Sequence, residues 1–222
     1  MSGRRLLLLR HGVTDWNREG RFQGQLDPPL SADGLDEARL LAERLASDTD
    51  LRPAHVVSSS LSRASQTAEL VAAACGATLA SDPRLVEVGQ GVWEGRTHDE
   101  LAVTDAARYA AWRDGGGRQP PGGESLDSVR GRVAAAIEDL LGGDAWPLAI
   151  VSHGGTLRLL AGRLLELASE RSWALDLDNA SLSALTQSPD GAWRVDRWND
   201  TLHLLGHQPT HVDEAEGHPL AL

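Results

Sequence analysis

Two short apolar runs in this chain each lead, through one polar residue, to a histidine that is followed by glycine. Residues 6–9 lead to His11, and residues 148–151 lead to His153. A short run that is apolar at every position predicts a strand buried on both faces, which is typical of the centre of a parallel sheet. Ligands of open α/β sheets bind beyond the carboxyl ends of the strands. The two runs therefore predict a central sheet with two histidines at its binding edge.

Strand patterns and helix patterns alternate along the rest of the chain. A further strand is predicted over residues 55–58, a hairpin over residues 182–185 and 193–198, and helices over residues 35–45, 61–74, 129–141 and 154–167. Ser60 is expected to cap the second of these helices. The alternation predicts an α/β fold, a three-layer α/β/α sandwich around a mostly parallel central sheet. We expect residues 1–205 to form a single domain and residues 206–222 to form a polar C-terminal tail.

Charge and cysteine content exclude several classes of protein. The 222 residues include 21 basic ones, all arginine, against 32 acidic ones, and the net charge is −11. A general nucleic-acid binder needs a surplus of cations, so no nucleic-acid partner is expected. The lone Cys75 cannot form an internal disulfide, and no apolar run is long enough to span a membrane. We expect a cytoplasmic protein without a membrane partner.

A third strand end adds an arginine to the two histidines. The strand at residues 55–58 leads to Arg63 on the first turn of the next helix, and Arg10 directly precedes His11. Forked guanidinium groups can hold several oxygens of one phosphoryl group, and they disfavour a protonated imidazole nearby. The glycine after each histidine lets a backbone N–H approach an anion. This pattern predicts phosphoryl transfer with histidine as the nucleophile.

Five segments that occur in order along the chain carry a resemblance to a known family. They are residues 9–34, 58–69, 85–95, 122–125 and 152–158. Together they resemble the signature of the histidine phosphatase (phosphoglycerate mutase-like) superfamily, and they span nearly the whole chain. The resemblance implies the fold of that superfamily.

The resemblance also implies a role for each matching residue. His11 is expected to become a phosphohistidine, with Arg10, Arg63 and His153 around the phosphoryl oxygens. Further donors are expected from Asn17, from Gln23-Gly24 and from the Gly154 N–H. Glu87, which follows a strand-like entry at residues 84–86, is expected to protonate the leaving oxygen and then to activate water. No metal or organic cofactor is implied, because the arginines supply the positive charge.

Two enzymatic interpretations and one non-enzymatic interpretation compete. Mutases of the family carry an arginine-histidine-tyrosine run after the catalytic glutamate, where this chain has Val88-Gly89-Gln90. The run Trp93-Glu94-Gly95 resembles the phosphatase branch instead. Within that branch, the length, the Trp112-Arg113 region, the Gly-Gly-Glu-Ser run and the Arg197-Trp198-Asn199 ending resemble glucosyl-3-phosphoglycerate phosphatases. Broad-specificity phosphatases and ribazole-phosphate phosphatases share many of these features. We therefore expect a phosphatase acting on a small phosphorylated metabolite, as a monomer or homodimer. The alternatives are a cofactor-dependent phosphoglycerate mutase and a non-catalytic phosphate-binding module.

Two further assignments have alternatives. Glu94 and Glu124 compete with Glu87 as the acid. The tail histidines at positions 203, 207 and 211 have helical spacing that could form a metal site, but Pro209 interrupts any helix between them. We expect no metal site there.

Overall fold

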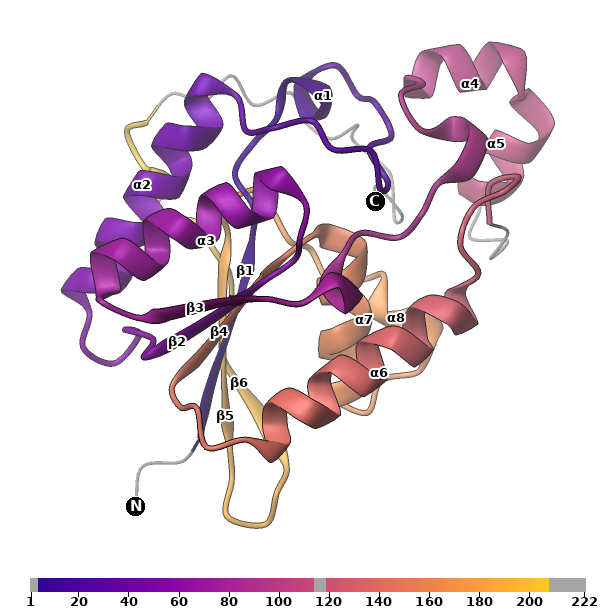
Figure 1. Ribbon diagram of the computed structural model, residues 1–222. Coiled ribbons are helices and arrows are strands. Elements are labelled where there is room, and N and C mark those ends of the chain that lie inside the picture. Colours follow the sequence, from indigo (N-terminus) through magenta and orange to yellow (C-terminus); the bar gives the residue numbers. More distant parts are fainter. Residues whose placement is uncertain (1–3, 114–118, 208–222) are drawn as a thin grey trace.

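A six-stranded sheet forms the centre of the protein in the computed structural model, which describes residues 4–113 and 119–207 (Figure 1). The strands are β1 (Arg5–Arg10), β2 (His55–Ser58), β3 (Thr78–Ser81), β4 (Leu148–Ser152), β5 (Leu182–Gln187) and β6 (Trp193–Asp200). Their order is β3-β2-β4-β1-β5-β6, and the first four are parallel. The hairpin of β5 and β6 adds an antiparallel edge beside β1. The predicted mostly parallel sheet is confirmed.

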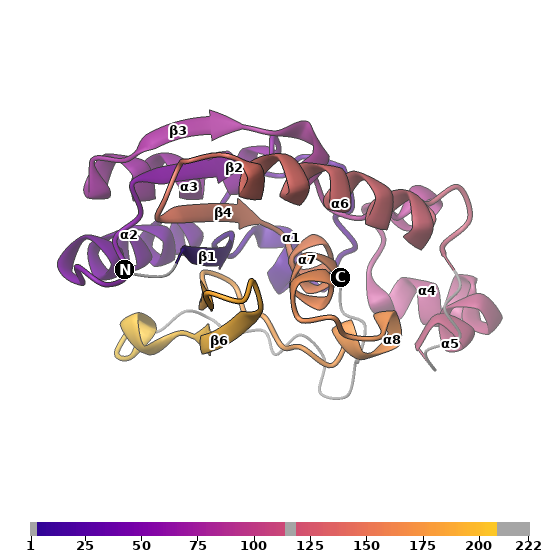
Figure 2. The same cartoon turned by 90° about the horizontal axis from the view of Figure 1, so that it is seen from below.

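Helices cover both faces of this sheet. They are α1 (Asp15–Arg18), α2 (Ala32–Ser47), α3 (Ser62–Cys75), α4 (His98–Thr104), α5 (Ala106–Arg113), α6 (Leu126–Gly142), α7 (Gly154–Leu164) and α8 (Ser169–Ser172), with 3₁₀ turns η1 (Pro83–Leu85), η2 (Gly91–Trp93) and η3 (Leu202–Leu204). Figure 2 shows α2 and α3 on one side of the sheet and α6 and α7 on the other. The three-layer α/β/α sandwich is therefore confirmed.

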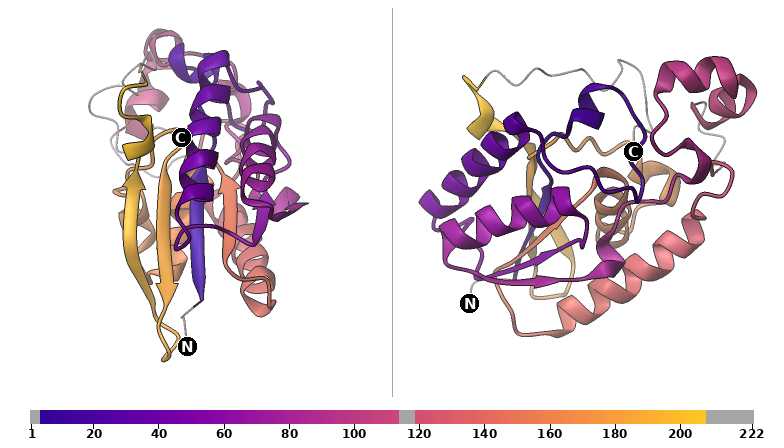
Figure 3. Two further views of the ribbon diagram at one scale, coloured as in Figure 1. Left: turned by 90° about the vertical axis from the view of Figure 1, so that its left-hand side faces the viewer. Right: turned by 45° about the horizontal axis from the view of Figure 1, so that its top comes forward.

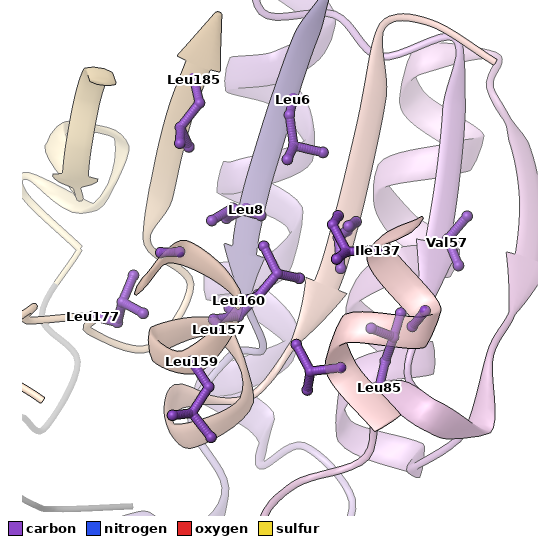
Figure 4. Close-up of a cluster of buried hydrophobic side chains, with 14 of the residues drawn as sticks. Leu6, Leu8, Val57, Leu85, Ile137, Leu157, Leu159, Leu160, Leu177 and Leu185 are labelled. Atoms are coloured by element: carbon purple, nitrogen blue, oxygen red, sulfur yellow. The ribbon is translucent and has the colours of Figure 1, made fainter. Parts of the chain in front are cut away.

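The leucine run of β1 packs on both faces of the sheet. Leu6 and Leu8 belong to the apolar cluster beneath α6 and α7 (Figure 4), and Leu7 and Leu9 belong to the cluster beneath α2 and α3. Side chains alternate between the two faces of a strand, so a strand covered on both faces needs an apolar residue at every position. This explains why β1 reads as an unbroken run rather than an alternating pattern.

A third apolar cluster lies away from the sheet. Phe22, Trp93, Leu101, Tyr109 and Trp112 pack together there, joining α4 and α5 to the loops that contain Phe22 and Trp93. Figure 3 shows α4 and α5 standing apart from the layers of the sandwich, beyond the end of the sheet. The cluster anchors this helical pair beside the loop that holds Gln23 and Gly24.

The boundaries of several elements differ from the predictions. Ser60 is not a helix cap, because α3 begins at Ser62 with Leu61 at the cap position and no side-chain cap bond. The strand-like entry at residues 84–86 is largely the 3₁₀ turn η1, which begins at Pro83, a residue whose fixed φ suits a turn. The last predicted helix ends at Leu164 rather than at residue 167. No described helix combines the length and apolar character needed to cross a bilayer.

Candidate active site

Three neighbouring parallel strands bring the predicted site residues together. Arg10 is the last residue of β1 and His11 follows it, while His153 directly follows β4 at the cap position of α7. Arg63 lies on the first turn of α3, beyond the end of β2. Because β2, β4 and β1 are adjacent, their carboxyl ends meet at one edge (Figure 1). The ring centroids of His11 and His153 are 5.1 Å apart there.

The local contacts of His11 determine which ring nitrogen is available. Its Nδ1 lies 2.7 Å from the Gly12 carbonyl oxygen, which can only accept, so Nδ1 carries the proton and Nε2 keeps its lone pair. The side chain is 3% exposed. Burial lowers its pKa well below the usual value, and the charges of Arg63 and Arg10 lower it further. His11 is therefore a neutral imidazole with a free lone pair at Nε2.

His153 is fixed by partners on both ring nitrogens. Nδ1 accepts a hydrogen bond from Arg63 Nε at 3.2 Å, so the proton lies on Nε2, which is 2.8 Å from Ser59 Oγ. Burial lowers the pKa of His153, and the charges of Arg63 and Arg10 lower it further. Burial also lowers the pKa of Arg63 to about 10, which the charge of Glu87 partly opposes.

Arg63 connects these residues to the loop after α1. Its Nη2 and Nη1 donate to the carbonyl oxygens of Gly24 and Leu26, both at 2.9 Å. Gly24 has a positive φ of 51°, and a Cβ there would overlap the carboxylate of Glu94. Gln23 beside it is buried, and its Oε1 has no hydrogen-bond partner among the described residues. This places Gly24 against Arg63, while the donation by Gln23-Gly24 to a phosphoryl group stays a prediction.

Position 12 is glycine for a different reason from the expected one. Its N–H donates to Thr67 Oγ1 at 3.2 Å rather than standing open for an anion. A Cβ at position 12 would overlap the carbonyl oxygen of Gly34 on the first turn of α2. Close packing of two backbone segments therefore requires glycine here. Gly154 begins α7, and a Cβ there would lie 3.2 Å from Arg158 Nη1.

Asn17 lies on α1, in the turn that follows Gly12 and Val13. Its side-chain oxygen accepts from the Thr14 backbone N–H at 3.0 Å, and Thr14 Oγ1 accepts from the Asn17 N–H at 3.1 Å. This reciprocal capping pair fixes the start of α1. The orientation of Asn17 is therefore set by the same short helix that follows the His11 loop.

Glu87 is held at the N-terminus of α7. One carboxylate oxygen accepts from the backbone N–H groups of Val88 at 2.8 Å and Thr156 at 3.0 Å, and the other accepts from Gly155 at 3.1 Å. The side chain is 4% exposed. A helix N-terminus presents unpaired N–H groups and a positive dipole end, so it positions a carboxylate there. The Glu87 carboxylate thereby lies against the first turn of the helix that follows His153.

The two alternative acids have other partners. Glu94 Oε1 accepts from the backbone N–H groups of Gln25 and Gln90, and so holds two loops together. Glu124 is paired through both oxygens with Arg132. Burial works against the charged form of Glu124, but the hydrogen bonds from Arg132 outweigh burial and lower its pKa. Both carboxylates serve as structural acceptors here.

Two residues next to the site carried no role in the sequence interpretation. Arg132 on α6 donates through Nη1 to the carbonyl oxygen of Val86 at 2.7 Å and through Nη2 to that of Glu87 at 3.0 Å. Asn179 donates to the carbonyl oxygen of His11 at 3.0 Å. Neither is near its target in sequence, and each lies outside the five motif segments. No local pattern could have identified them.

Of the three histidines with helical spacing near the C-terminus, those at positions 203 and 207 lie within the described residues. His203 Nε2 lies 3.0 Å from the carbonyl oxygen of Ala180, so this imidazole contacts the backbone. Position 211 lies outside the described residues. Within residues 4–113 and 119–207, no three His, Cys, Asp or Glu side chains are grouped so that they could hold a metal ion.

The fold and these gathered side chains define an α/β protein with histidines and arginines at the carboxyl edge of a parallel sheet. The family model of the histidine phosphatase superfamily (branch 1) matches residues 6–201, and the chain belongs to that superfamily. This confirms the resemblance and the phosphoglycerate mutase-like fold that it implied.

Similar proteins carry different named activities. A Photorhabdus laumondii protein named "Probable phosphoglycerate mutase GpmB" is 38% identical, over 89% of this chain and 93% of the relative. The solved structure of mycobacterial glucosyl-3-phosphoglycerate phosphatase complexed with VO3 is 36% identical with a TM-score of 0.79, over 88% of this chain and 99% of the other. The α-ribazole phosphatase of Shigella flexneri is 33% identical with a TM-score of 0.78, over 89% and 96%.

Proposed function

We propose that this protein is a phosphomonoesterase that hydrolyses a small phosphorylated metabolite through a phosphohistidine on His11. The observation that carries the proposal is the state of that imidazole. Nδ1 is committed to the Gly12 carbonyl oxygen, and Nε2 holds a lone pair in a buried site near Arg10 and Arg63. A neutral imidazole is a competent nucleophile, and guanidinium groups stabilise the charge of a transferring phosphoryl group.

In the first step, His11 Nε2 attacks phosphorus and forms the P–N bond as the ester P–O bond breaks. Glu87 acts in its protonated form here: the leaving oxygen takes the carboxyl proton and departs as an alcohol. Arg10 and Arg63 hold the phosphoryl oxygens, and His153 joins them when its Nε2–H turns from Ser59 Oγ to the phosphoryl group. Asn17, Gln23-Gly24 and Gly154 supply further donors. Arg63 and Glu94 already hold the loop of Gly24 and Gln25 in place, so this loop needs little reorganisation.

In the second step, water replaces the alcohol. Its oxygen attacks phosphorus while the Glu87 carboxylate takes a water proton, and the electron pair of the P–N bond returns to Nε2. Inorganic phosphate leaves, and both His11 and Glu87 recover their starting protonation states. The complete cycle needs no metal or organic cofactor, because the arginines supply the positive charge.

The second candidate, a phosphoglycerate mutase, is favoured by the names of several relatives. A mutase must retain a bisphosphate, which needs cations beyond those that hold the first phosphoryl group. The arginines nearest to Glu87 in the chain and beside its backbone are already paired with carboxylates: Arg84 with Asp82 and Asp139, Arg96 with Glu100, and Arg132 with Glu124. This distribution of charge supports water as the acceptor.

Turnover on a panel of phosphomonoesters tests the proposal. The panel includes glucosyl-3-phosphoglycerate, because a structural neighbour is named for it, together with α-ribazole phosphate, 3-phosphoglycerate and p-nitrophenyl phosphate. We expect phosphate release from at least one sugar- or glycerate-type ester to exceed interconversion of 2- and 3-phosphoglycerate, followed by ³¹P NMR. Interconversion faster than release would show a mutase. Binding without turnover of any ester would show a non-catalytic module.

A further inference from the structure

The segment at residues 175–181 passes across the end of β1, between α8 and β5. Three of its successive backbone carbonyl oxygens accept hydrogen bonds from side chains of other elements. Leu175 accepts from Arg158 Nε at 2.8 Å, Asp176 from Trp198 Nε1 at 2.8 Å, and Leu177 from Arg10 Nη1 at 2.5 Å. The segment is therefore tied to α7, to β6 and to one of the phosphoryl-binding arginines.

The next residues of the segment contact the backbone of His11. Asn179 Nδ2 donates to the carbonyl oxygen of His11 at 3.0 Å and approaches that of Gly12 at 3.4 Å. The backbone N–H of Ala180 donates to the same His11 carbonyl at 3.0 Å. The Gly12 carbonyl oxygen is also the acceptor for His11 Nδ1. One amide group thus reaches the acceptor that fixes the tautomer of the nucleophile.

The backbone around Asn179 is held from both sides. Asp178 and Asn199 form two hydrogen bonds. The Asp178 N–H donates to Asn199 Oδ1 at 2.7 Å, and Asn199 Nδ2 donates to Asp178 Oδ2 at 2.9 Å. Ala180 is fully buried with a φ of 52°, a left-handed conformation that costs a residue with a Cβ about 1 kcal/mol or more. Such a conformation persists only where surrounding contacts impose it.

We infer that Asn179 is a positioning residue for the nucleophile: by binding the carbonyl groups of His11 and Gly12, it keeps the proton of His11 on Nδ1 and leaves Nε2 for phosphorus. The catalytic consequence rests on the function proposed above. The statement about the tautomer does not, because it can be measured without substrate.

Asn179→Ala tests this inference, with Gln187→Ala as the matched control. Gln187 also donates its amide to a backbone carbonyl, that of Gly191, but at the far end of β5. The ring nitrogens of His11 are followed by ¹⁵N NMR, and phosphoenzyme formation from p-nitrophenyl phosphate by rapid quench. We expect the wild type and Gln187→Ala to hold the Nδ1–H tautomer. Asn179→Ala should populate Nε2–H as well, and should form phosphoenzyme about 10- to 100-fold more slowly with little change in KM.

A second variant covers the possibility that Asn179→Ala does not fold. Asn199→Gly removes both contacts to Asp178 and suits the positive φ of 50° at that position. It should give the same mixture of tautomers with a smaller loss of rate. A pure Nδ1–H signal in the folded variants, or phosphoenzyme formation at the wild-type rate, would overturn the inference and leave Asn179 with a structural role. Absence of phosphohistidine in the wild type would overturn the proposed function instead.

Discussion

At the residue scale, the proposed chemistry depends on where the proton of His11 lies. The Gly12 carbonyl holds it on Nδ1, while burial and two guanidinium groups keep the ring uncharged. Ordinary histidines are partly protonated near neutral pH. His11 Nε2 therefore keeps its lone pair at a pH at which an exposed imidazole would be partly protonated.

Replacing the nucleophile should abolish turnover. We expect His11→Ala to retain less than about one hundredth of the wild-type rate, because loss of a nucleophile commonly costs several orders of magnitude. Acid-quenched wild type incubated with ³²P-labelled substrate should carry an acid-labile, base-stable label. A label found on serine would rule out the phosphohistidine, and a higher residual rate would favour direct attack by water.

Replacing the acid should affect substrates unequally. An alkoxide needs protonation as it leaves and p-nitrophenolate does not, so Glu87→Gln should slow alkyl phosphate hydrolysis by an additional one or two orders of magnitude, roughly the usual contribution of general acid catalysis. The comparison uses kcat/KM, which reports the first step. Phosphoenzyme should accumulate with the activated substrate, because the second step loses its base.

Glu94→Gln is the matched control, since Glu94 also accepts backbone N–H groups. Glu94→Gln should lower kcat/KM for both substrates by the same factor. In Glu87→Gln, the new NH2 group must face a backbone donor of Val88, Gly155 or Thr156, so some loss of stability is expected and thermal unfolding must be followed alongside. Equal losses for both leaving groups in Glu87→Gln would assign the acid elsewhere.

At the level of the secondary-structure elements, α6 and α7, which cover one face of the sheet, position Glu87, the proposed acid. The N-terminus of α7 binds the Glu87 carboxylate, and Arg132 on α6 binds its backbone carbonyl. Gln25 Nε2 donates to that same carbonyl at 3.1 Å. The position of Glu87 thus depends on how α6 and α7 pack, even though Glu87 belongs to neither helix.

Replacing either of two glycines in these helices by alanine should change the free energy of unfolding, in opposite directions for the two positions. A Cβ at Gly162 of α7 would overlap Ser172 of α8, whereas nothing lies within 4 Å of a Cβ at Gly131 of α6. Gly162→Ala should lower the free energy of unfolding by about 1–3 kcal/mol through overpacking. Gly131→Ala should raise it by about 0.5–1 kcal/mol, the usual helix-propensity gain. Urea denaturation measures both, and destabilisation by Gly131→Ala would show a close contact there.

At the scale of the whole molecule, the two buried histidines link folding to pH. Burial, followed by the charge of Arg63, lowers the pKa of both His11 and His153. Unfolded chains protonate histidine near pH 6.5. Between the folded and the unfolded pKa the unfolded state binds more protons, so stability is present above about pH 6.5 and is lost as the pH falls.

In that window, we expect each of the two histidines to lower the free energy of unfolding by about 1.4 kcal/mol for each unit by which the pH falls. Urea unfolding between pH 7.5 and 5 measures the slope. In the double variant His11→Asn, His153→Asn, the free energy of unfolding should depend less steeply on pH over this range. The paired carboxylates affect stability at lower pH. An unchanged slope in the double variant would contradict the lowered pKa values.

Prediction from sequence succeeded where the physical cause is local in the chain. The leucines of β1 predicted a strand buried on both faces, and the His11 and His153 strand ends predicted one shared edge. It failed at β3, whose four residues are all exposed, because an edge strand outside the core has no apolar pattern. It also assigned Gly12 to anion binding, whereas contact with Gly34 requires it.

The layers of the fold and the family could be predicted from the sequence, because apolar alternation and ordered motifs are properties of neighbouring positions. The sequence also supplied His11, Arg10, Arg63 and His153, since a parallel sheet brings its strand ends together. Three features became visible only in the folded protein. They are the nitrogen of His11 that carries the proton, the binding of the Glu87 carboxylate at the N-terminus of α7, and the contact of Asn179 with the His11 backbone. Those features depend on contacts between segments far apart in the chain, and such contacts exist only once the layers have packed.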